Sequence, residues 1–299
     1  MQKRPTTTPM KPTPQIVSRR SAIKTATATA ILGTAIFRQP AFASPLKGNI
    51  NHAVCRWCYP DIELADLCRA AREIGIAGID LVGPDEWPVL KRFGLTASLP
   101  HGAGKGIADG FNDLRLHDEL VASYERIIPQ VAEAGYDKII CFSGNRNGLD
   151  DEQGIHNCAV GLKRLMPAAE KYGVTMVMEL LNSKVDHPDY QCDHTAWGVA
   201  LCDEIGSERF KLLYDIYHMQ IMEGDVIATI RKYNQYIAHY HTGGVPGRNE
   251  IDETQELNYG AIMEAIVQTG FEGYVAQEFV PKRRDPLVSL KQAIAICDV

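Results

Sequence analysis

From Gly48 onward the chain alternates short apolar runs with longer amphipathic stretches, without an internal linker, charge block or low-complexity segment. This alternation restricts the fold more than any other feature of the sequence. Each apolar run is aliphatic on both faces, which is typical of a strand buried in a parallel sheet. The runs predict eight strands, over Ile50–Cys55, Gly78–Val82, Leu95–Leu99, Lys138–Phe142, Val174–Leu180, Phe210–Tyr214, Tyr236–Tyr240 and Gly273–Phe279.

The amphipathic stretches predict helices between and after these strands, over Ile62–Ile74, His117–Ala134, Gly154–Tyr172, His194–Ile205, Gly224–Tyr233, Tyr259–Thr269 and Pro286–Cys297. Five of them are followed by a glycine that suits a left-handed cap: Gly75, Gly135, Gly173, Gly206 and Gly270. Eight strand-then-helix units predict an α/β fold, a single (β/α)8 TIM barrel whose strand ends share one mouth. The competing fold is a doubly wound open sheet, but no Gly-x-Gly-x-x-Gly turn follows the first strand.

Four metal-seeking side chains fall at or near the C-terminal ends of four successive predicted strands: Glu179, Asp215, His241 and Glu278. A strand that is apolar on both faces has no structural reason to finish on a carboxylate or an imidazole unless that end binds something. Three carboxylates and one histidine that converge there would hold one divalent cation. Oxygen-dominated ligation suits Mg²⁺ or Mn²⁺ best and leaves Co²⁺ and Zn²⁺ open.

The first 43 residues predict an export signal and not part of the fold. Arg19 and Arg20 precede a mild apolar run that ends at Ala43, the pattern of a twin-arginine signal peptide. The run from Ala26 to Phe37 is shorter than the roughly 20 residues that a spanning helix needs. We therefore expect cleavage after Ala43, a periplasmic location and no stable membrane insertion, with an uncleaved tether or a cytoplasmic tail as alternatives.

The charge of the remaining 256 residues excludes one class of partner. The segment 1–43 contains seven of the 31 basic residues and none of the 37 acidic ones, so 24 basic residues face 37 acidic ones and the net charge is −13. Such a chain repels nucleic acid phosphates, and its length fits one barrel domain. We expect a small-molecule substrate and no nucleic acid, and the sequence leaves a homo-oligomer open.

Eight cysteines fall within the predicted barrel. Cys55 and Cys58 have the spacing of a zinc knuckle, but no second pair stands at a matching distance. Buried thiols are therefore the favoured interpretation, and a disulfide stays open in an oxidising compartment.

Several local strings resemble a known family. The chain is similar to the xylose-isomerase-like superfamily of barrels, and within it to the hydroxypyruvate isomerases, over most of Asn51–Pro281. The segments that carry this resemblance are Tyr-Asp-Ile-Tyr-His-Met-Gln at 214–220, Pro-Gly-Arg at 246–248, Phe-Ser-Gly-Asn-Arg at 142–146 and Asn-Tyr at 258–259.

The resemblance implies a single divalent ion bound by the four residues named above, with Glu179 and Glu278 as the acid/base pair. It also implies that His218 and Arg248 contact substrate oxygens. Histidine at position 241 is shared with the related ketose 3-epimerases, whereas bacterial hydroxypyruvate isomerases can carry glutamine there.

The chemistry of such a site can be argued from the residues. Moving a carbonyl group to the adjacent carbon requires removal of a proton next to the carbonyl, and the resulting enediolate needs its negative oxygens neutralised, which a metal ion does. Carboxylates beside the substrate would carry the proton, an effect worth roughly 10² to 10⁴ in rate. The resemblance implies that the reaction is the isomerisation of hydroxypyruvate to tartronate semialdehyde.

Four further positions are ambiguous from sequence. Arg248 follows a Pro-Gly turn, where it would pair with a substrate carboxylate or simply be solvated. His101 ends the third strand and would line the pocket or lie in a glycine-rich loop. Trp57 and Tyr59 follow the first strand, where either would form a wall beside the substrate or pack in the core.

Four other functions compete with the isomerase. A ketose 3-epimerase or related sugar epimerase would use the same glutamates at one carbon, and an inosose-type dehydratase is a further option. An apurinic endonuclease needs an Asp-x-His pair after the seventh strand, where this chain has Gly247-Arg248-Asn249. A non-catalytic sugar-binding protein would have no need of both glutamates.

Overall fold

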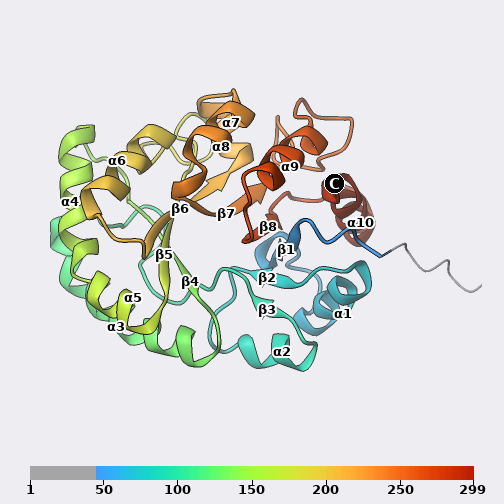
Figure 1. Ribbon diagram of the computed structural model, residues 1–299, viewed down its shortest axis with the longest axis horizontal. Helices are drawn as coiled ribbons and strands as arrows, with labels where there is room; N and C mark the ends of the chain where they lie inside the picture. The colour runs from blue at the N-terminus through green and yellow to red at the C-terminus, as the bar shows by residue number, and fades with distance from the viewer. Residues whose placement is uncertain (1–44) are drawn as a thin grey trace, which may run out of the picture. The chain divides into compact units, whose positions relative to one another are not determined.

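Eight parallel strands form one sheet in the computed structural model, which describes residues 45–299 (Figure 1). The order along the sheet is β3-β2-β1-β8-β7-β6-β5-β4. The strands are β1 Asn51–Cys55, β2 Gly78–Asp80, β3 Thr96–Ala97, β4 Lys138–Cys141, β5 Thr175–Glu179, β6 Phe210–Asp215, β7 Ile237–Thr242 and β8 Tyr274–Gln277.

The sheet curls into a barrel because its first and last strands are neighbours. β1 pairs with both β2 and β8, so the chain returns to its starting strand after one circuit. Within residues 45–299 no strand ladder joins β3 to β4, but the Ile140 N–H donates to the carbonyl oxygen of Pro100 across that seam, at 3.1 Å. The predicted TIM barrel is confirmed, and the doubly wound sheet is excluded.

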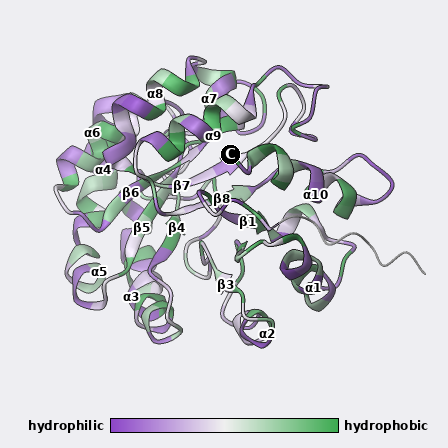
Figure 2. Cartoon of the chain, turned by 45° about the vertical axis from the view of Figure 1, so that its right-hand side comes forward, coloured by the Kyte–Doolittle hydropathy of each residue, from purple (hydrophilic) through white to green (hydrophobic). Residues whose placement is uncertain are grey.

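Helices surround the strands on the outside of the ring (Figure 1). They are α1 Leu64–Ile74, α2 Trp87–Arg92, α3 His117–Glu133, α4 Asp151–Lys163, α5 Met166–Tyr172, α6 Thr195–Ile205, α7 Ile216–Met222, α8 Val226–Tyr233, α9 Tyr259–Gln268 and α10 Pro286–Cys297, with 3-10 turns η1 Arg56–Cys58, η2 Leu114–Leu116 and η3 Asn234–Tyr236. Figure 2 shows hydrophilic and hydrophobic stretches alternating along these helices, as expected when one face packs on the sheet and the other meets water.

Two predicted elements differ from the observed ones for local reasons. The helix predicted over Gly154–Tyr172 is two helices, α4 and α5, because Pro167 lacks an N–H and its ring would clash with the carbonyl of Lys163, the last residue of α4. The third strand shrinks to Thr96–Ala97, although parallel hydrogen bonding continues where the Leu81 N–H donates to Leu99. The short helices α2 and α7 were not expected.

Two predicted helix ends illustrate how the sequence sets element boundaries. Gly75 and Gly206 end α1 and α6 in the left-handed conformation, with φ of 97° and 70°. A residue with a Cβ atom would be strained there, so glycine at these positions lets each helix stop and the chain turn toward the next strand.

The predictions about the first 43 residues lie outside the described part of the chain. Across residues 45–299, no helix has the length and apolar character required to cross a membrane. All eight cysteines belong to the described residues and are buried without forming a disulfide.

Candidate active site

Four side chains from adjacent strands meet inside the barrel mouth. Glu179 ends β5, Asp215 ends β6, His241 lies near the end of β7 and Glu278 follows β8. The parallel register sets Asp215 directly opposite His241, so both side chains point to the same face of the sheet. One ligand atom from each of the four lies within 4.8 Å of all the others, and all four residues are buried. The structure therefore brings together the four residues that the sequence singled out.

The carboxylate of Glu278 is held by three donors. Nδ1 of His241 lies 2.8 Å from Oε2, and Nη2 of Arg248 donates to the same oxygen at 2.6 Å. The indole N–H of Trp57 donates to Oε1 at 2.8 Å. Burial would raise the pKa of Glu278, but the charges of His241 and Arg248 outweigh it and hold the pKa well below its usual range. Glu278 is therefore a carboxylate.

Glu179 differs from Glu278 in its hydrogen bonding and in the direction of its pKa shift. Its Oε1 is buried and has no hydrogen-bond partner among residues 45–299, although it lies 3.3 Å from Nδ1 of His241. Burial and then the nearby charge of Glu278 raise the pKa of Glu179. Burial likewise raises the pKa of Asp215 well above its usual range, against the opposing charge of Arg248. A buried carboxylate oxygen without a donor fits a cation ligand.

Arg248 crosses the top of this cluster. Its guanidinium carbon lies 5.1 Å from the ring centre of Trp57 and 5.3 Å from that of Tyr217. Its Nη2 also lies 3.5 Å from Oδ2 of Asp215. The side chain is mostly buried, so Arg248 is not a solvated loop arginine but part of the site.

His218 reaches the site through helix α7. Oδ1 of Asp215 accepts the backbone N–H of His218 at 3.1 Å and so caps the start of this helix. Nδ1 of His218 accepts the backbone N–H of Asn182 at 3.1 Å, which leaves the ring proton on Nε2. Burial, reinforced by the charge of Arg248, lowers the pKa of His218 well below 6.5, so the ring is neutral. Its Nε2 is buried, lies 3.7 Å from Oδ2 of Asp215 and has no hydrogen-bond partner in the described chain.

Two other candidates are not brought to the cluster. His101 lies exposed in the loop after β3, and within residues 45–299 its side chain makes no hydrogen bond or ion pair. Tyr59 is buried in the hydrophobic core. Trp57, by contrast, is 44% exposed while its indole N–H reaches Glu278, so it forms part of the wall of the site.

One residue of the site was missed by the sequence analysis. Asp80, the last residue of β2, is completely buried, and its Oδ2 lies 3.0 Å from Nε2 of His241. The signal that would have revealed it is the same as for the other carboxylates, since an acidic residue ends a buried strand. The strand was instead predicted to run on to Val82, which hid Asp80 in its interior.

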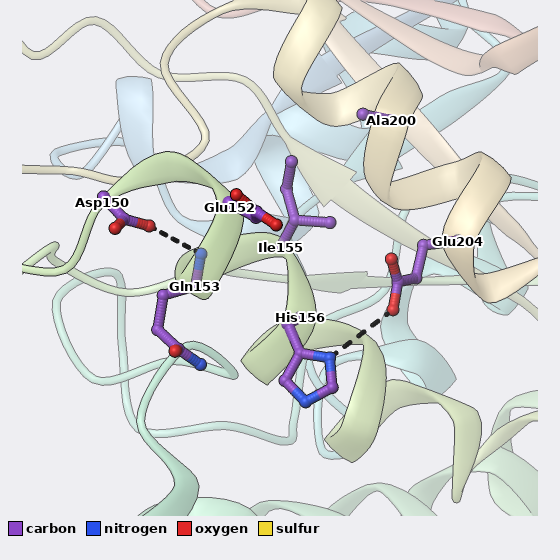
Figure 3. A pocket seen from close by; sticks show the side chains of 7 residues that line it. All are labelled: Asp150, Glu152, Gln153, Ile155, His156, Ala200 and Glu204. Atoms are coloured by element: carbon purple, nitrogen blue, oxygen red, sulfur yellow. Dashed lines mark hydrogen bonds and ion pairs between the residues drawn. The ribbon is translucent and has the colours of Figure 1, made fainter.

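A separate pocket of about 480 Å³ lies between α4 and α6, away from these residues (Figure 3). His156 and Glu204 face each other across it at 3.8 Å, and Asp150 caps α4 by accepting the Gln153 N–H. None of its seven lining residues belongs to the cluster in the barrel mouth. It is an open groove between two surface helices.

The ring of parallel strands and the buried cluster define a (β/α)8 barrel with a candidate metal centre at its mouth. Residues 68–296 match the family described as Xylose isomerase-like TIM barrel, and the chain belongs to this family.

Individual relatives agree with this assignment. The 2-oxo-tetronate isomerase of Cupriavidus necator is 36% identical over 115 residues, which are 38% of this chain and 44% of that protein. The chain thus spans less than half the length of that relative. A Drosophila melanogaster protein named putative hydroxypyruvate isomerase is 25% identical over 232 residues, 73% of this chain and 86% of that protein. The solved structure of AP endonuclease, family 2, from Brucella melitensis has a TM-score of 0.73 at 22% identity, covers 81% of this chain and 97% of that one, and shows the shared fold alone.

Proposed function

We propose that this protein is a metal-dependent isomerase that moves a carbonyl group between adjacent carbons of a small hydroxy-carbonyl acid, with hydroxypyruvate to tartronate semialdehyde as the leading reaction. The observation that carries the proposal is the convergence of two glutamates, one aspartate and one histidine within 4.8 Å of one another, with Arg248 beside them. The names of the two relatives support the same class of reaction.

The residues of the cluster fit a divalent cation. Glu179, Asp215, His241 and Glu278 would hold it, and the buried Oε1 of Glu179 is otherwise without a donor among residues 45–299. Together, a divalent ion and the positive charge of Arg248 would balance the negative charges of the three carboxylates. The oxygen-rich donor set suits Mg²⁺ or Mn²⁺, with Co²⁺ or Zn²⁺ as alternatives. When bound, such an ion supplies neutralisation of the negative charge that develops on the substrate oxygens.

Glu179 is the better placed proton carrier of the two glutamates. Its raised pKa brings it nearer to neutral pH, whereas Glu278 is fixed by three donors and has a lowered pKa. In the proposed reaction Glu179 takes a proton from the hydroxymethyl carbon, and a proton returns to the neighbouring carbon while the hydroxyl proton passes to the other oxygen. Glu278 starts the reaction as a charged carboxylate, orients the site and serves as the second acid/base group.

Arg248 and His218 would position the substrate. Arg248 offers a planar, permanently charged fork, which suits the carboxylate of a small keto acid. The neutral ring of His218 presents its unpartnered Nε2–H as a hydrogen-bond donor to a substrate oxygen. Trp57 and Tyr217 place aromatic rings 5.1 Å and 5.3 Å from the guanidinium carbon and would help to orient it.

Turnover in D₂O tests the proposal. We expect the Mn²⁺-loaded protein to convert hydroxypyruvate and to place one deuterium on the carbon that receives the proton. No turnover of hydroxypyruvate or 2-oxo-tetronate under saturating Mn²⁺ would count against the acid isomerase.

A second candidate is a ketose 3-epimerase. The observation that favours it is that both glutamates lie in one cluster with His241. In such an arrangement one carboxylate would remove a proton from a single carbon, and the other would return a proton on the opposite face of that carbon. The same D₂O experiment with a panel of ketoses distinguishes the two, because an epimerase would label C3 of the sugar.

We also propose that the protein reaches the periplasm through its twin-arginine segment. The support is the Arg19-Arg20 pair followed by the apolar run that ends at Ala43. Replacement of both arginines by lysine should leave the protein in the cytoplasmic fraction of a bacterial host, and unchanged export of this variant would contradict the proposal.

A further inference from the structure

His241 presents its two ring nitrogens to two different groups of acids. Nδ1 faces the candidate metal cluster, 2.8 Å from Oε2 of Glu278 and 3.3 Å from Oε1 of Glu179. Nε2 faces Asp80, whose Oδ2 lies 3.0 Å away. Asp80 comes from β2, a strand that contributes none of the four predicted ligands.

We propose that Asp80 is a positioning residue of the metal centre, which holds the proton on Nε2 of His241 and so presents the lone pair of Nδ1 to the cation. A neutral imidazole carries one proton, and the hydrogen bond made by one nitrogen decides which nitrogen is left to bind a metal. A carboxylate behind a metal-binding histidine also fixes the ring orientation and makes the ring a stronger ligand. This inference rests on the proposed metal-dependent function.

Asp80 is itself fixed by other donors. The hydroxyl of Ser98 donates to Oδ1, and Nε2 of His239 donates to Oδ2 at 2.5 Å. Nδ1 of His239 is buried without a hydrogen-bond partner among residues 45–299, so its single proton belongs on Nε2. The hydroxyl of Ser98 and the ring of His239 therefore hold the carboxylate of Asp80 in a set geometry.

Among the residues that the structure describes, no other group near Nε2 of His241 competes well for its proton. Sγ of Cys55 also lies near Nε2 of His241, at 3.7 Å, but sulfur is a weak acceptor. The carboxylate of Asp80 is both closer and charged, which makes it the acceptor that decides the tautomer.

The inference is tested with Asp80→Asn, which keeps the shape but not the charge, and Asp80→Ala, which removes the acceptor. The matched control is Thr242→Val. Thr242 follows His241 on β7, and its buried hydroxyl donates to Oε1 of Gln277 at 2.8 Å. Calorimetric titration of each full-length protein with Mn²⁺ should show about 10-fold weaker binding for Asp80→Asn and up to about 100-fold weaker binding for Asp80→Ala. Thr242→Val should bind as the wild type does.

A spectroscopic readout separates positioning from a general structural effect. In ¹⁵N-histidine-labelled protein loaded with Mg²⁺, the His241 signals, identified by their loss in His241→Gln, should report a protonated Nε2 in the wild type and in Thr242→Val. They should report a mixture of tautomers in Asp80→Asn. Unchanged Mn²⁺ affinity and an unchanged Nε2 signal in Asp80→Asn would overturn this inference alone, whereas a wild type that binds no Mn²⁺ would overturn the metal centre as well.

Discussion

Nη2 of Arg248 lies 2.6 Å from Oε2 of Glu278, and this contact joins the candidate substrate-binding arginine to a candidate acid/base residue. The indole N–H of Trp57 donates to the other oxygen of the same carboxylate while its ring lies under the guanidinium. Nη1 of Arg248 makes no hydrogen bond among residues 45–299. The arginine therefore has donors left for an anionic substrate while it holds Glu278 in place.

The first prediction concerns Arg248→Lys. Lysine keeps the charge but loses the planar fork and the contact with both aromatic rings, so it cannot replace a bidentate pair with a carboxylate. A hydrogen bond to a charged group contributes about 1.5 to 3 kcal/mol, which corresponds to a rise of roughly 10- to 100-fold in KM for hydroxypyruvate. Steady-state kinetics with hydroxypyruvate and with a neutral ketose measures this difference. An equal rise in KM for both substrates would show that Arg248 does not bind a carboxylate.

The second prediction concerns the two glutamates. Glu179→Gln and Glu278→Gln each keep an oxygen that can bind a cation but remove a proton carrier, so kcat should fall by roughly 10² to 10⁴ at saturating Mn²⁺. We expect the larger loss in Glu179→Gln, because Glu179 has the raised pKa and the free oxygen. Retention of kcat within about tenfold in Glu179→Gln would remove that residue from the proton transfer. Thr242→Val serves as the control for a buried polar change nearby.

The third prediction concerns pH. Burial opposes a charged ring, but Cys55, the charge of Glu278 and the Asp80 hydrogen bond raise the pKa of His241 well above 6.5. The charged ring therefore stabilises the metal-free fold below pH 6.5, and this contribution is lost as the pH rises through the folded-state pKa. Because a cation must displace the proton from Nδ1, Mn²⁺ affinity should increase with pH over the same window.

Calorimetric titration with Mn²⁺ between about pH 6 and about pH 9, in two buffers of different ionisation enthalpy, counts the released protons. His241→Gln is the matched control, since an amide does not titrate and should flatten the part of the pH dependence that belongs to this residue. Equal slopes in the two proteins would show that His241 does not bind the cation.

The fourth prediction concerns the packing behind Asp215. A Cβ atom added to Gly198 of α6 would lie 2.9 Å from Cδ2 of Leu212 in β6, which is too close. Gly198→Ala should therefore destabilise the fold by about 1 to 3 kcal/mol. Gly260→Ala in α9 is the control, because its Cβ would meet its nearest atom at an ordinary 3.6 Å and alanine favours a helix. Urea unfolding that gives Gly198→Ala and Gly260→Ala the same stability would contradict the tight packing of α6 on β6.

The sequence predicted the barrel and its four clustered side chains because both depend on local patterns. A buried parallel strand is a short aliphatic run, and an acidic residue or histidine at its end stands out against that run. The pairing of Asp215 with His241 follows once both strands are assigned. Their roles as metal ligands stay a prediction.

The rest of the site depends on contacts between distant residues. The link between Trp57 and Glu278 joins positions 221 residues apart, and no local pattern encodes it. Asp80 was hidden because β2 ends two residues earlier than its aliphatic run suggested. Helix α7 was missed because the sequence analysis assigned the carboxylate of Asp215 to metal binding alone. In the structure, Oδ1 of Asp215 caps the start of this helix and Oδ2 faces Arg248.

The most direct test of the account is a crystal structure of the protein soaked with Mn²⁺, with the ion located by its anomalous scattering. We predict one Mn²⁺ per chain, bound by one atom each from Glu179, Asp215, His241 and Glu278, with Nδ1 as the histidine ligand. A Mn²⁺ ion bound elsewhere, or none at this cluster under conditions in which the protein is active, would contradict the central claim.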